Sequence, residues 1–596
     1  MNALISAAVV AVIQPPPPGT PPCAVSPSGA TVANFCDTPG SLHVPVAYFS
    51  IGPILILFVG ALLLLAIAAI LPKRSRPGLW SLLTAAVGGA ATIFAAFNWA
   101  DVSTNGGRST FGQQVLYDRF TVLFYVLVGS ATVIGALLAD SYLQRESLDG
   151  PESYVLMLLC GSGAMLMAAS GGLVMVFLGL EILSISLYVM SAYHRRRLES
   201  GEAGLKYFIL GSFSSAIFLY GAALVYGATG STQFGEINRF LTANTLANNG
   251  VLLAGMALLI VGLGFKVAAV PFHFWTPDVY QGAPTPFTGY MGAVAKAAGF
   301  AGLLRVLLEA LPSQQVNWRP VIWVLAVLTL LVGSVLAIVQ KDLKRMLAYS
   351  SISQAGYVLI GLEAASREGT ASALFYLLTY TFIVMGSFAV VQLIQGEGEA
   401  RNDLGAVRGL SRRRPGLALI MVLFLMAQAG VPFTSGFLAK FYVIAAVIQR
   451  GQYALAVIGM LAAALAAFFY LRVGLLMYSA PEGAGDGEAA DSTLTAGLGG
   501  DRGAGGAGPS RSSVASGRRP GSSGDDAGVS LAGGDASLAG GEDSGAAVVT
   551  LEAPPVTKVK IPLTVAIALG VCAGFTVFAG VSAPVLDFAK QATILF

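Results

Sequence analysis

Residues 265–300 read FKVAAVPFHFWTPDVYQGAPTPFTGYMGAVAKAAGF, and this stretch decides the fold. Lys266 and Lys296 stand in otherwise apolar sequence, and Val270-Pro271-Phe272 interrupts what would be a helical run. Proline removes a backbone donor and clashes with the carbonyl four residues earlier, so the helix should kink or break there. We therefore predict a membrane helix that is broken near Pro271, with a charged side chain beside the break.

The same combination returns later in the chain. Residues 428–442 read QAGVPFTSGFLAKFY and place Val431-Pro432-Phe433 shortly before Lys440, and Glu181 lies in the apolar stretch FLGLEILSIS. A charge at the centre of a bilayer costs on the order of several kcal/mol, so such residues normally face protein or water. One acid and three lysines, far apart along the chain, predict a route for protons or ions.

The bulk composition supports a membrane location. The chain has 596 residues, of which 55% are hydrophobic and only 11% charged, whereas an average soluble protein has about 25% charged residues. Apolar runs recur at the length of about 20 residues that a helix needs to cross about 30 Å of hydrocarbon. Since the bilayer core offers no water, each run must satisfy its own backbone as a helix. The fold class is therefore an all-α polytopic membrane protein.

Fourteen spans are predicted, and the seventh and twelfth are broken. They cover residues 46–71, 79–97, 119–139, 153–170, 172–192, 204–227, 250–272, 284–310, 320–339, 343–362, 370–395, 416–449, 452–478 and 561–588. Spans 4–8 and spans 9–13 make two sets of five, with the broken helix fourth in each. Because five is odd, the second set would run through the membrane inverted, which is typical of transporters.

The chain is expected to divide into segments of different character. These are an external proline-rich segment (1–45), spans 1–3 (46–152), a first repeat (153–310), a second repeat (320–480), a linker (481–557) and the last span with the C-terminus (558–596). The linker has eleven acidic residues, four basic residues and no aromatic residue. Such a composition cannot bury enough apolar surface to fold. We predict a disordered linker that leaves a basic membrane domain.

The basic residues of the loops predict the orientation. Four loops on one side of the predicted membrane domain are rich in them: Lys73, Arg74 and Arg76; Arg195, Arg196 and Arg197; Lys341, Lys344 and Arg345; Arg401, Arg408, Arg412, Arg413 and Arg414. Loops rich in Lys and Arg stay in the cytoplasm. With an even number of spans, both termini are then external and the linker is cytoplasmic.

Cysteine and histidine are too sparse for a metal or cluster site. The chain has four cysteines without CxxC spacing and three histidines, whereas iron–sulfur and structural zinc sites need clustered ligands. Cys23 and Cys36 could form an external disulfide or remain two free thiols, and the sequence leaves both open. No Gly-rich dinucleotide motif and no P-loop is present.

The quoted motifs resemble a known family. Residues 265–300, the stretch KDLKRMLAYSSISQAGYVLIG and the stretch GVPFTSGFLAKFYV are similar to signatures of the antiporter-like proton-translocating subunits of respiratory complex I, which are shared with Mrp-type cation/proton antiporters. Lys440-Phe441-Tyr442 is similar to the N-type branch of this family, whereas the M-type branch has a glutamate at that position. The linker and the proline-rich start depart from the family pattern.

The resemblance implies a role for each intramembrane charge. It implies that Glu181 pairs with Lys266, that Lys296 is a central relay and that Lys440 is the exit-side lysine. Burial disfavours the charged form of a lysine and a nearby carboxylate favours it, so moving Glu181 away would make Lys266 release its proton. Lys206 could feed protons inward or merely extend toward the interface, and His273 could be an ancillary relay or a structural hydrogen-bonding group.

The span at 370–395 is the weakest part of this route, because it contains no Lys, His, Asp or Glu. Only neutral groups such as Thr379, Tyr380, Thr381 and Ser387 could guide water toward Lys440. Sequence alone therefore leaves the connection between Lys296 and Lys440 to ordered water.

The resemblance also implies partners and a location. The chain would be a proton-translocating subunit of an NADH:quinone oxidoreductase in a bacterial plasma membrane, beside an M-type subunit and small membrane subunits. It would bind no cofactor itself, since NADH, FMN, iron–sulfur clusters and quinone would belong to partner subunits, and no nucleic acid is expected. The alternative is a subunit of an Mrp-type cation/proton antiporter.

Overall fold

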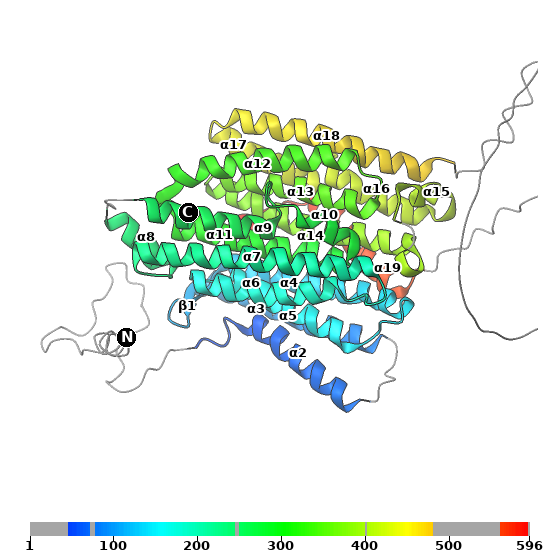
Figure 1. Ribbon diagram of the computed structural model, residues 1–596, viewed down its shortest axis with the longest axis horizontal. Helices are drawn as coiled ribbons and strands as arrows, with labels where there is room; N and C mark the ends of the chain where they lie inside the picture. Colours follow the sequence, from blue (N-terminus) through cyan, green and yellow to red (C-terminus); the bar gives the residue numbers. More distant parts are fainter. Residues whose placement is uncertain (1–45, 72–77, 245–248, 400–401, 481–560, 594–596) are drawn as a thin grey trace, which may run out of the picture. The chain divides into compact units, whose positions relative to one another are not determined.

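The computed structural model describes residues 46–71, 78–244, 249–399, 402–480 and 561–593. The predictions for the segment 1–45, for Cys23 and Cys36, and for the linker 481–557 lie outside the described residues. The described residues belong to one compact unit, and Figure 1 shows it as a set of helices lying roughly side by side.

The first half of the described chain contains two short strands among its helices. These are α2 (Gly52–Ile70), α3 (Leu79–Asn105), β1 (Arg108–Thr110), β2 (Val115–Tyr117), α4 (Arg119–Arg145), α5 (Pro151–Ala168), α6 (Leu173–Ser191), α7 (Leu198–Thr229), α8 (Phe234–Ala243), α9 (Gly250–Val267), α10 (Trp275–Gly282), α11 (Thr285–Arg305) and the π-helix η1 (Val306–Ala310). The two strands pair antiparallel.

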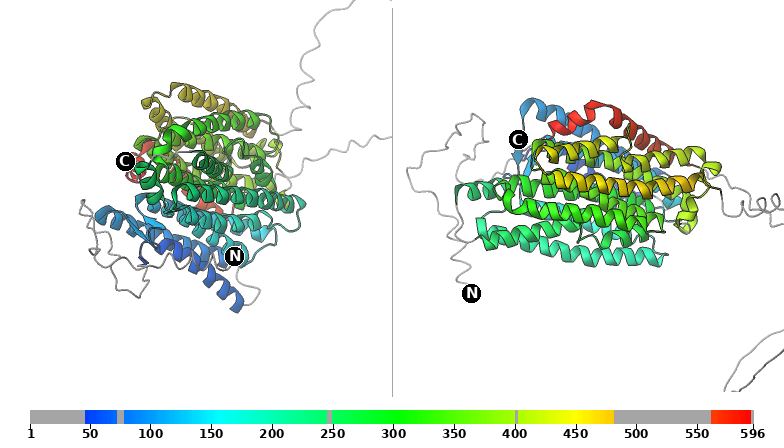
Figure 2. Two further views of the ribbon diagram at one scale, coloured as in Figure 1. Left: turned by 60° about the vertical axis from the view of Figure 1, so that its left-hand side comes forward. Right: turned by 90° about the horizontal axis from the view of Figure 1, so that it is seen from above.

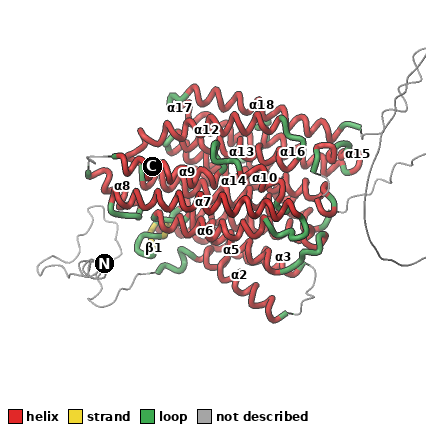
Figure 3. The backbone as a smooth tube through the Cα atoms, in the orientation of Figure 1, coloured by secondary structure: helices red, strands yellow, loops and turns green. Residues whose placement is uncertain are grey.

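The second half contains helices and connecting loops, and no strand among its described residues. It contains η2 (Pro312–Gln314), α12 (Gln315–Ile338), α13 (Leu343–Glu363), α14 (Arg367–Gln395), η3 (Glu397–Glu399), η4 (Leu404–Val407), α15 (Leu410–Arg413), α16 (Pro415–Ala429), α17 (Ser435–Gln449), α18 (Tyr453–Tyr478), α19 (Leu563–Val581) and α20 (Ala583–Gln591). Figure 3 shows the described loops, in green, between the helices from α12 to α18.

Twelve of the described helical segments are long and apolar enough to cross a membrane. The prediction of a polytopic helical membrane protein is therefore confirmed. Two further elements carry predicted spans: α13, and the pair of shorter apolar helices α16 and α17. The two further views in Figure 2 show the same side-by-side arrangement of the long helices.

Two helices at the centre are enclosed by protein. In the segments Thr285–Ala310 and Arg367–Gln395, which include α11 and α14, the whole apolar window is buried within the molecule, whereas only 28% of that window is buried in α2. Almost every side chain of α13 is also buried. Polar groups on these central helices therefore face other helices rather than lipid, and can form hydrogen bonds with them.

Both Val-Pro-Phe motifs break their helices. α9 ends at Val267, four residues before Pro271, and α10 begins at Trp275. α16 ends at Ala429, and α17 begins at Ser435 with its first turn capped by the Thr434 side chain. The predicted span 250–272 is thus too long at its C-terminal end, because the clash of a proline falls on the carbonyl four residues earlier.

Candidate functional site

Lys266 is buried in the last turn of α9, with 3% of its surface exposed. Its Nζ donates to Ser184 Oγ of α6 at 2.8 Å and to Tyr207 OH of α7 at 3.1 Å. Gly299 of α11 lets the helices approach this closely, since a Cβ there would lie 3.3 Å from Lys266 Cγ. The ammonium is therefore held by two neutral oxygens from two different helices.

Glu181 lies one turn before Ser184 on α6 and is close enough to act on the charge of Lys266. Among the described residues the two side chains form no direct ion pair, and Glu181 Oε1 is buried without a hydrogen-bond partner. Glu181 and Lys266 are thus neighbours without direct contact, and the lysine binds the Ser184 hydroxyl instead. A buried carboxylate oxygen without a hydrogen bond costs free energy. Because electrostatic interactions are stronger in the protein interior than in water, a small movement of this carboxylate changes its interaction with Lys266 strongly.

Lys296 lies in the middle of α11 and is 3% exposed. Its Nζ donates to the carbonyl oxygen of Ser351 on α13 and lies 5.9 Å from the centre of the Tyr380 ring on α14. The Tyr380 hydroxyl in turn donates to Ser351 Oγ at 2.8 Å. Lys296 therefore lies where three enclosed helices meet.

Lys440 lies on α17 just after the second break and is 5% exposed. Its Nζ donates to the carbonyl oxygens of Gln428 at 2.7 Å and Ala429 at 3.0 Å, at the end of α16. Pro432 has no N–H to bond the carbonyl four residues earlier, which is that of Gln428. The break therefore supplies the oxygen that the lysine binds.

Close packing at this break brings α17 against α16. A Cβ at Gly436 would lie 1.8 Å from the Ala427 carbonyl oxygen, so only glycine fits there. The Lys440 side chain follows about one turn later on α17 and lies 4.7 Å from the centre of the Tyr357 ring. Proline and glycine together thus fix the lysine against the open end of α16.

A hydrogen-bonded cluster that the sequence did not reveal lies between Lys296 and Lys440. Its members are neutral and come from four helices: Ser350 and Gln354 of α13, Tyr376 of α14, Gln428 of α16 and Tyr470 of α18. None has a charge or a motif that marks it. The useful signal was the unusual number of hydroxyl and amide groups in YSSISQAGY, a stretch whose side chains are enclosed.

The predicted ancillary residues lie elsewhere. Lys206 forms ion pairs with Asp278 at 2.8 Å and Glu202 at 2.6 Å, and its side chain is 41% exposed. His273 is buried in the loop between α9 and α10, packed on Phe274. Because α9 ends at Val267, His273 and Lys266 do not lie on one continuous helix.

Several buried charges outside the lysine series form ion pairs. Glu399 Oε2 receives Lys344 Nζ at 2.9 Å and Arg197 Nη1 at 2.7 Å, while Thr285 N donates to Oε1 at 2.8 Å. Burial alone would raise the pKa of Glu399, but the charges of Lys344 and Arg197 and the hydrogen bonds from Lys344 and Thr285 lower it to about 2. This group, which we call the Glu399 cluster, ties the ends of α7, α11 and α13 together.

A second paired group surrounds Arg305 at the end of α11. The guanidinium is fully buried and binds Asp118 at 2.8 Å and Glu309 at 2.9 Å. Asp118 also caps α4, accepting from Thr121 N at 2.8 Å. This arrangement satisfies every charge locally and fits a structural role.

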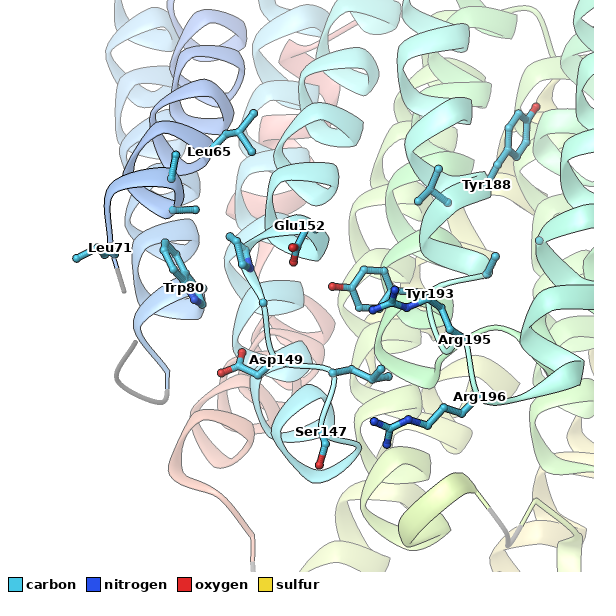
Figure 4. A pocket seen from close by; sticks show the side chains of 18 of the residues that line it. Leu65, Leu71, Trp80, Ser147, Asp149, Glu152, Tyr188, Tyr193, Arg195 and Arg196 are labelled. Atoms are coloured by element: carbon cyan, nitrogen blue, oxygen red, sulfur yellow. The ribbon is translucent and has the colours of Figure 1, made fainter. Parts of the chain in front are cut away.

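One large hollow in the described structure lies away from the lysine series. It has a volume of about 1400 Å³ and opens between α2, the start of α5, and α6–α7. Figure 4 shows Leu65 and Trp80 on one side and Tyr193, Arg195 and Arg196 on the other. Within the described ranges no group of three or more His, Cys, Asp or Glu side chains is placed to hold a metal ion.

The fold and these contacts define a class of protein. It is a polytopic helical membrane protein in whose described residues three buried lysines are bound to neutral oxygens, two of them at helix breaks. Comparisons with known proteins identify the class further. Residues 170–466 match the family described as NADH:quinone oxidoreductase/Mrp antiporter, TM.

Curated relatives include proteins named NADH-quinone oxidoreductase subunit N. The one from Trichlorobacter lovleyi is 44% identical over 72% of this chain and 87% of its own length. The one from Mycobacterium tuberculosis is 40% identical over 73% of this chain and 90% of its own length. The chain therefore belongs to the family of antiporter-like membrane subunits of NADH:quinone oxidoreductase.

Solved structures agree. A chain of respiratory complex I from Thermus thermophilus is 34% identical with a TM-score of 0.61, and the match covers 72% of this chain and 90% of that one. A chain of the Mrp complex from Dietzia is 20% identical with a TM-score of 0.71, covering 91% and 97%. At that identity the Mrp match shows the fold alone.

Proposed function

We propose that this chain moves protons across a bacterial plasma membrane as the N-type subunit of a proton-pumping NADH:quinone oxidoreductase. Protons pass from Lys266 to Lys296 and on to Lys440, and Glu181 controls the first step. The observation that carries the proposal is shared by the three lysines: each is at most 5% exposed, and among the described residues each is bound only to neutral oxygens.

The chemistry follows from those partners. An ammonium without a carboxylate in direct contact can lose its proton without leaving an opposite charge buried and unpaired. Glu181 is near Lys266, and its Oε1 has no hydrogen-bond partner among the described residues, so it can move relative to the lysine. When Glu181 moves away, Lys266 gives up its proton to Lys296; when it returns, Lys266 takes up another.

The topology that serves this transport has fourteen spans. α13 and the pair α16–α17 supply the two spans beyond the twelve long apolar segments. The first repeat comprises α5, α6, α7, the pair α9–α10 and α11, and the second comprises α12, α13, α14, the pair α16–α17 and α18. The broken helix is fourth in each, as expected for inverted repeats. The Lys- and Arg-rich side is cytoplasmic, and both termini are external.

The redox chemistry lies in other subunits. NADH, FMN, iron–sulfur clusters and quinone bind partner chains, and this chain receives the free energy of electron transfer through contacts with neighbouring membrane subunits.

The test is proton pumping by the assembled complex in membrane vesicles. Lys266→Ala and Glu181→Ala should lower the number of protons pumped per NADH oxidised, while Lys590→Ala, which changes an exposed lysine of α20, should leave it unchanged. A normal ratio in both Lys266→Ala and Glu181→Ala, in complexes that oxidise NADH, would overturn the proposed route.

The second candidate is an Mrp-type cation/proton antiporter subunit, because the description of the family that residues 170–466 match includes Mrp antiporters. The two functions differ in their ion requirement. Proton pumping driven by NADH without added Na⁺ or K⁺ supports the first, and Na⁺- or K⁺-dependent proton exchange without NADH supports the second.

A further inference from the structure

The large hollow beside α2 has an apolar wall built from three helices. Leu65 lies near the end of α2, Val189 lies near the end of α6, and Phe208 lies in the first half of α7. Each of these side chains is about half exposed. Figure 1 shows α2 inclined away from its neighbours. The hollow therefore arises where α2 diverges from the other helices, and its apolar wall lies within the part of the chain that crosses the membrane.

Four charged side chains also line the hollow. Asp149 and Glu152 come from the start of α5, and Arg195 and Arg196 come from the loop that joins α6 to α7. Figure 4 shows the two acids toward α2 and the two arginines on the opposite side. Tyr193 lies close enough to Glu152 and to Arg195 for both charges to act on its hydroxyl. Acidic and basic groups thus share the end of the hollow at which α5 begins and α6 ends.

Within the described ranges, none of these four side chains forms an ion pair, and all four are exposed. The neighbouring charges have other partners, since Arg197 binds Glu399 and Arg145 binds Glu146. A purely anionic ligand would suit the arginines but would also face two carboxylates. A ligand that carries both a positive and a negative charge is complementary to the whole set.

The size of the hollow and its aromatic lining point to a lipid. Its volume of about 1400 Å³ exceeds the range of about 300–1,000 Å³ that is usual for small-molecule pockets. Trp80 and Tyr193 also line it, and such amphipathic rings are enriched where hydrocarbon meets water. A ligand that is long, apolar along one part and charged at one end therefore matches the hollow.

We propose that the hollow binds a glycerophospholipid whose headgroup carries a phosphate and a primary ammonium, the chemistry of phosphatidylethanolamine. Arg195 and Arg196 bind the phosphate, for which the planar guanidinium is well suited. Asp149 and Glu152 accept hydrogen bonds from the ammonium, which a trimethylammonium group could not donate. The acyl chains lie along the apolar wall, so the lipid fills the space between α2 and the α6–α7 pair. The inference goes beyond the proposed function and depends only on the geometry of the hollow.

The experiment photolabels the assembled complex in phosphatidylcholine vesicles that contain a small fraction of a lipid with a diazirine in its acyl chain. Three probes have the same acyl chains and carry the headgroup of phosphatidylethanolamine, phosphatidylcholine or phosphatidylglycerol. Mass spectrometry measures the labelling of peptides from α2, α6 and α7. Labelling of α18, which has many exposed apolar side chains, serves as the reference for unspecific contact with lipid.

A first variant tests the phosphate contacts. The double variant Arg195→Gln, Arg196→Gln removes both guanidiniums. Its matched control is Arg412→Gln, Arg413→Gln, because these two arginines of α15 are also exposed and do not line the hollow.

Two further variants test the ammonium contacts and the space itself. The double variant Asp149→Asn, Glu152→Gln removes both negative charges and keeps the shape of the side chains. Ala69→Trp fills the hollow without a change of charge, since Ala69 is exposed and lines it. Ala66→Trp is its control, because Ala66 is exposed on the same helix and does not line the hollow.

In the wild-type complex, the phosphatidylethanolamine probe should label the hollow more strongly than the other two probes. The arginine variant and Ala69→Trp should each lower this labelling more than about fivefold, and both controls should keep it. The acid variant should abolish the preference over phosphatidylglycerol.

Equal labelling by the three probes in the wild type would overturn the proposal, because the hollow would then take acyl chains without reading the headgroup. A preference for phosphatidylglycerol would overturn it in favour of a purely anionic lipid. An unlabelled hollow in the wild-type complex would overturn it in favour of cover by another subunit. If the arginine variant fails to assemble, the headgroup preference of the wild type and its loss in Ala69→Trp decide.

Discussion

Two groups of buried lysines in this molecule differ in their partners. Lys344 is fully buried and forms an ion pair with Glu399 at 2.9 Å. Lys266, Lys296 and Lys440 are almost as buried, but among the described residues their hydrogen bonds go to hydroxyl and carbonyl oxygens. A paired ammonium is fixed in its charged form, whereas one bound to neutral oxygens can exchange its proton.

The difference separates structure from transport. Breaking a buried ion pair leaves one charge uncompensated and is strongly destabilising. Replacing a buried charge that has no ion-pair partner by an apolar side chain of similar size removes the cost of burying that charge. The Glu399 cluster should therefore hold the helices together, and the three lysines should carry protons while contributing little to stability.

The largest effect is expected at Glu399. Glu399→Gln leaves Lys344 buried without a carboxylate, while Arg197 keeps Glu199 at 3.8 Å, and should destabilise the complex by about 3–5 kcal/mol. The measurement is the amount of assembled complex in the membrane and its melting temperature. Glu368→Gln, which changes an exposed glutamate of α14, is the control. Normal assembly and a wild-type melting temperature in Glu399→Gln would contradict the claim that ion-paired buried lysines are structural and the three others are not.

The ion pair between Glu399 and Lys344 predicts that the stability of the complex depends on pH. The pKa of Glu399 in the folded chain is about 2, below its ordinary value of 4.5. Its contribution, about 3 kcal/mol from the difference in pKa, is complete above about pH 4.5 and is lost as the pH falls toward 2. The melting temperatures of wild type and Glu399→Gln should converge on acidification; a constant gap between pH 7 and 3.5 would contradict this.

A smaller loss is expected at Asp118. Asp118→Ala removes the cap of α4 and one of the two carboxylates that bind Arg305, while Glu309 remains. The expected cost is about 2 kcal/mol. Thermal melting of the purified complex measures it, and a variant as stable as wild type would show that Glu309 alone satisfies the arginine.

Lys206 should matter little. Its ion pairs are partly exposed, and Asp278 keeps Arg345 as a partner at 2.6 Å in Lys206→Ala. The loss should be below about 1 kcal/mol, and the ratio of protons to NADH should stay at the wild-type value. A reduced ratio would instead place Lys206 on the entry route.

The smallest effect on stability is expected at Lys296 itself. In Lys296→Met the apolar side chain fills the place of the lysine, and only the hydrogen bond to the Ser351 carbonyl is lost. The free energy of unfolding should stay within about 1 kcal/mol of wild type. The measurements are the melting temperature and the amount of assembled complex. A loss as large as that of Glu399→Gln would mean that this lysine is structural too.

The sequence could predict the helices, both breaks and the four intramembrane charges, since proline, apolar length and isolated charge are local signals. The sequence did not give the exact residue at which α9 ends. It also did not reveal the neutral cluster around Gln428, because that cluster joins four helices through groups that are common in any chain. The position of Glu181 near Lys266 without a direct ion pair also depends on packing that no spacing encodes.

The central claim, that a buried lysine bound only to neutral oxygens carries protons, is tested most directly by the number of protons pumped per NADH in vesicles containing the Lys296→Met complex. The account predicts a ratio clearly below wild type, with assembly and NADH oxidation retained. A wild-type ratio in that variant would contradict it.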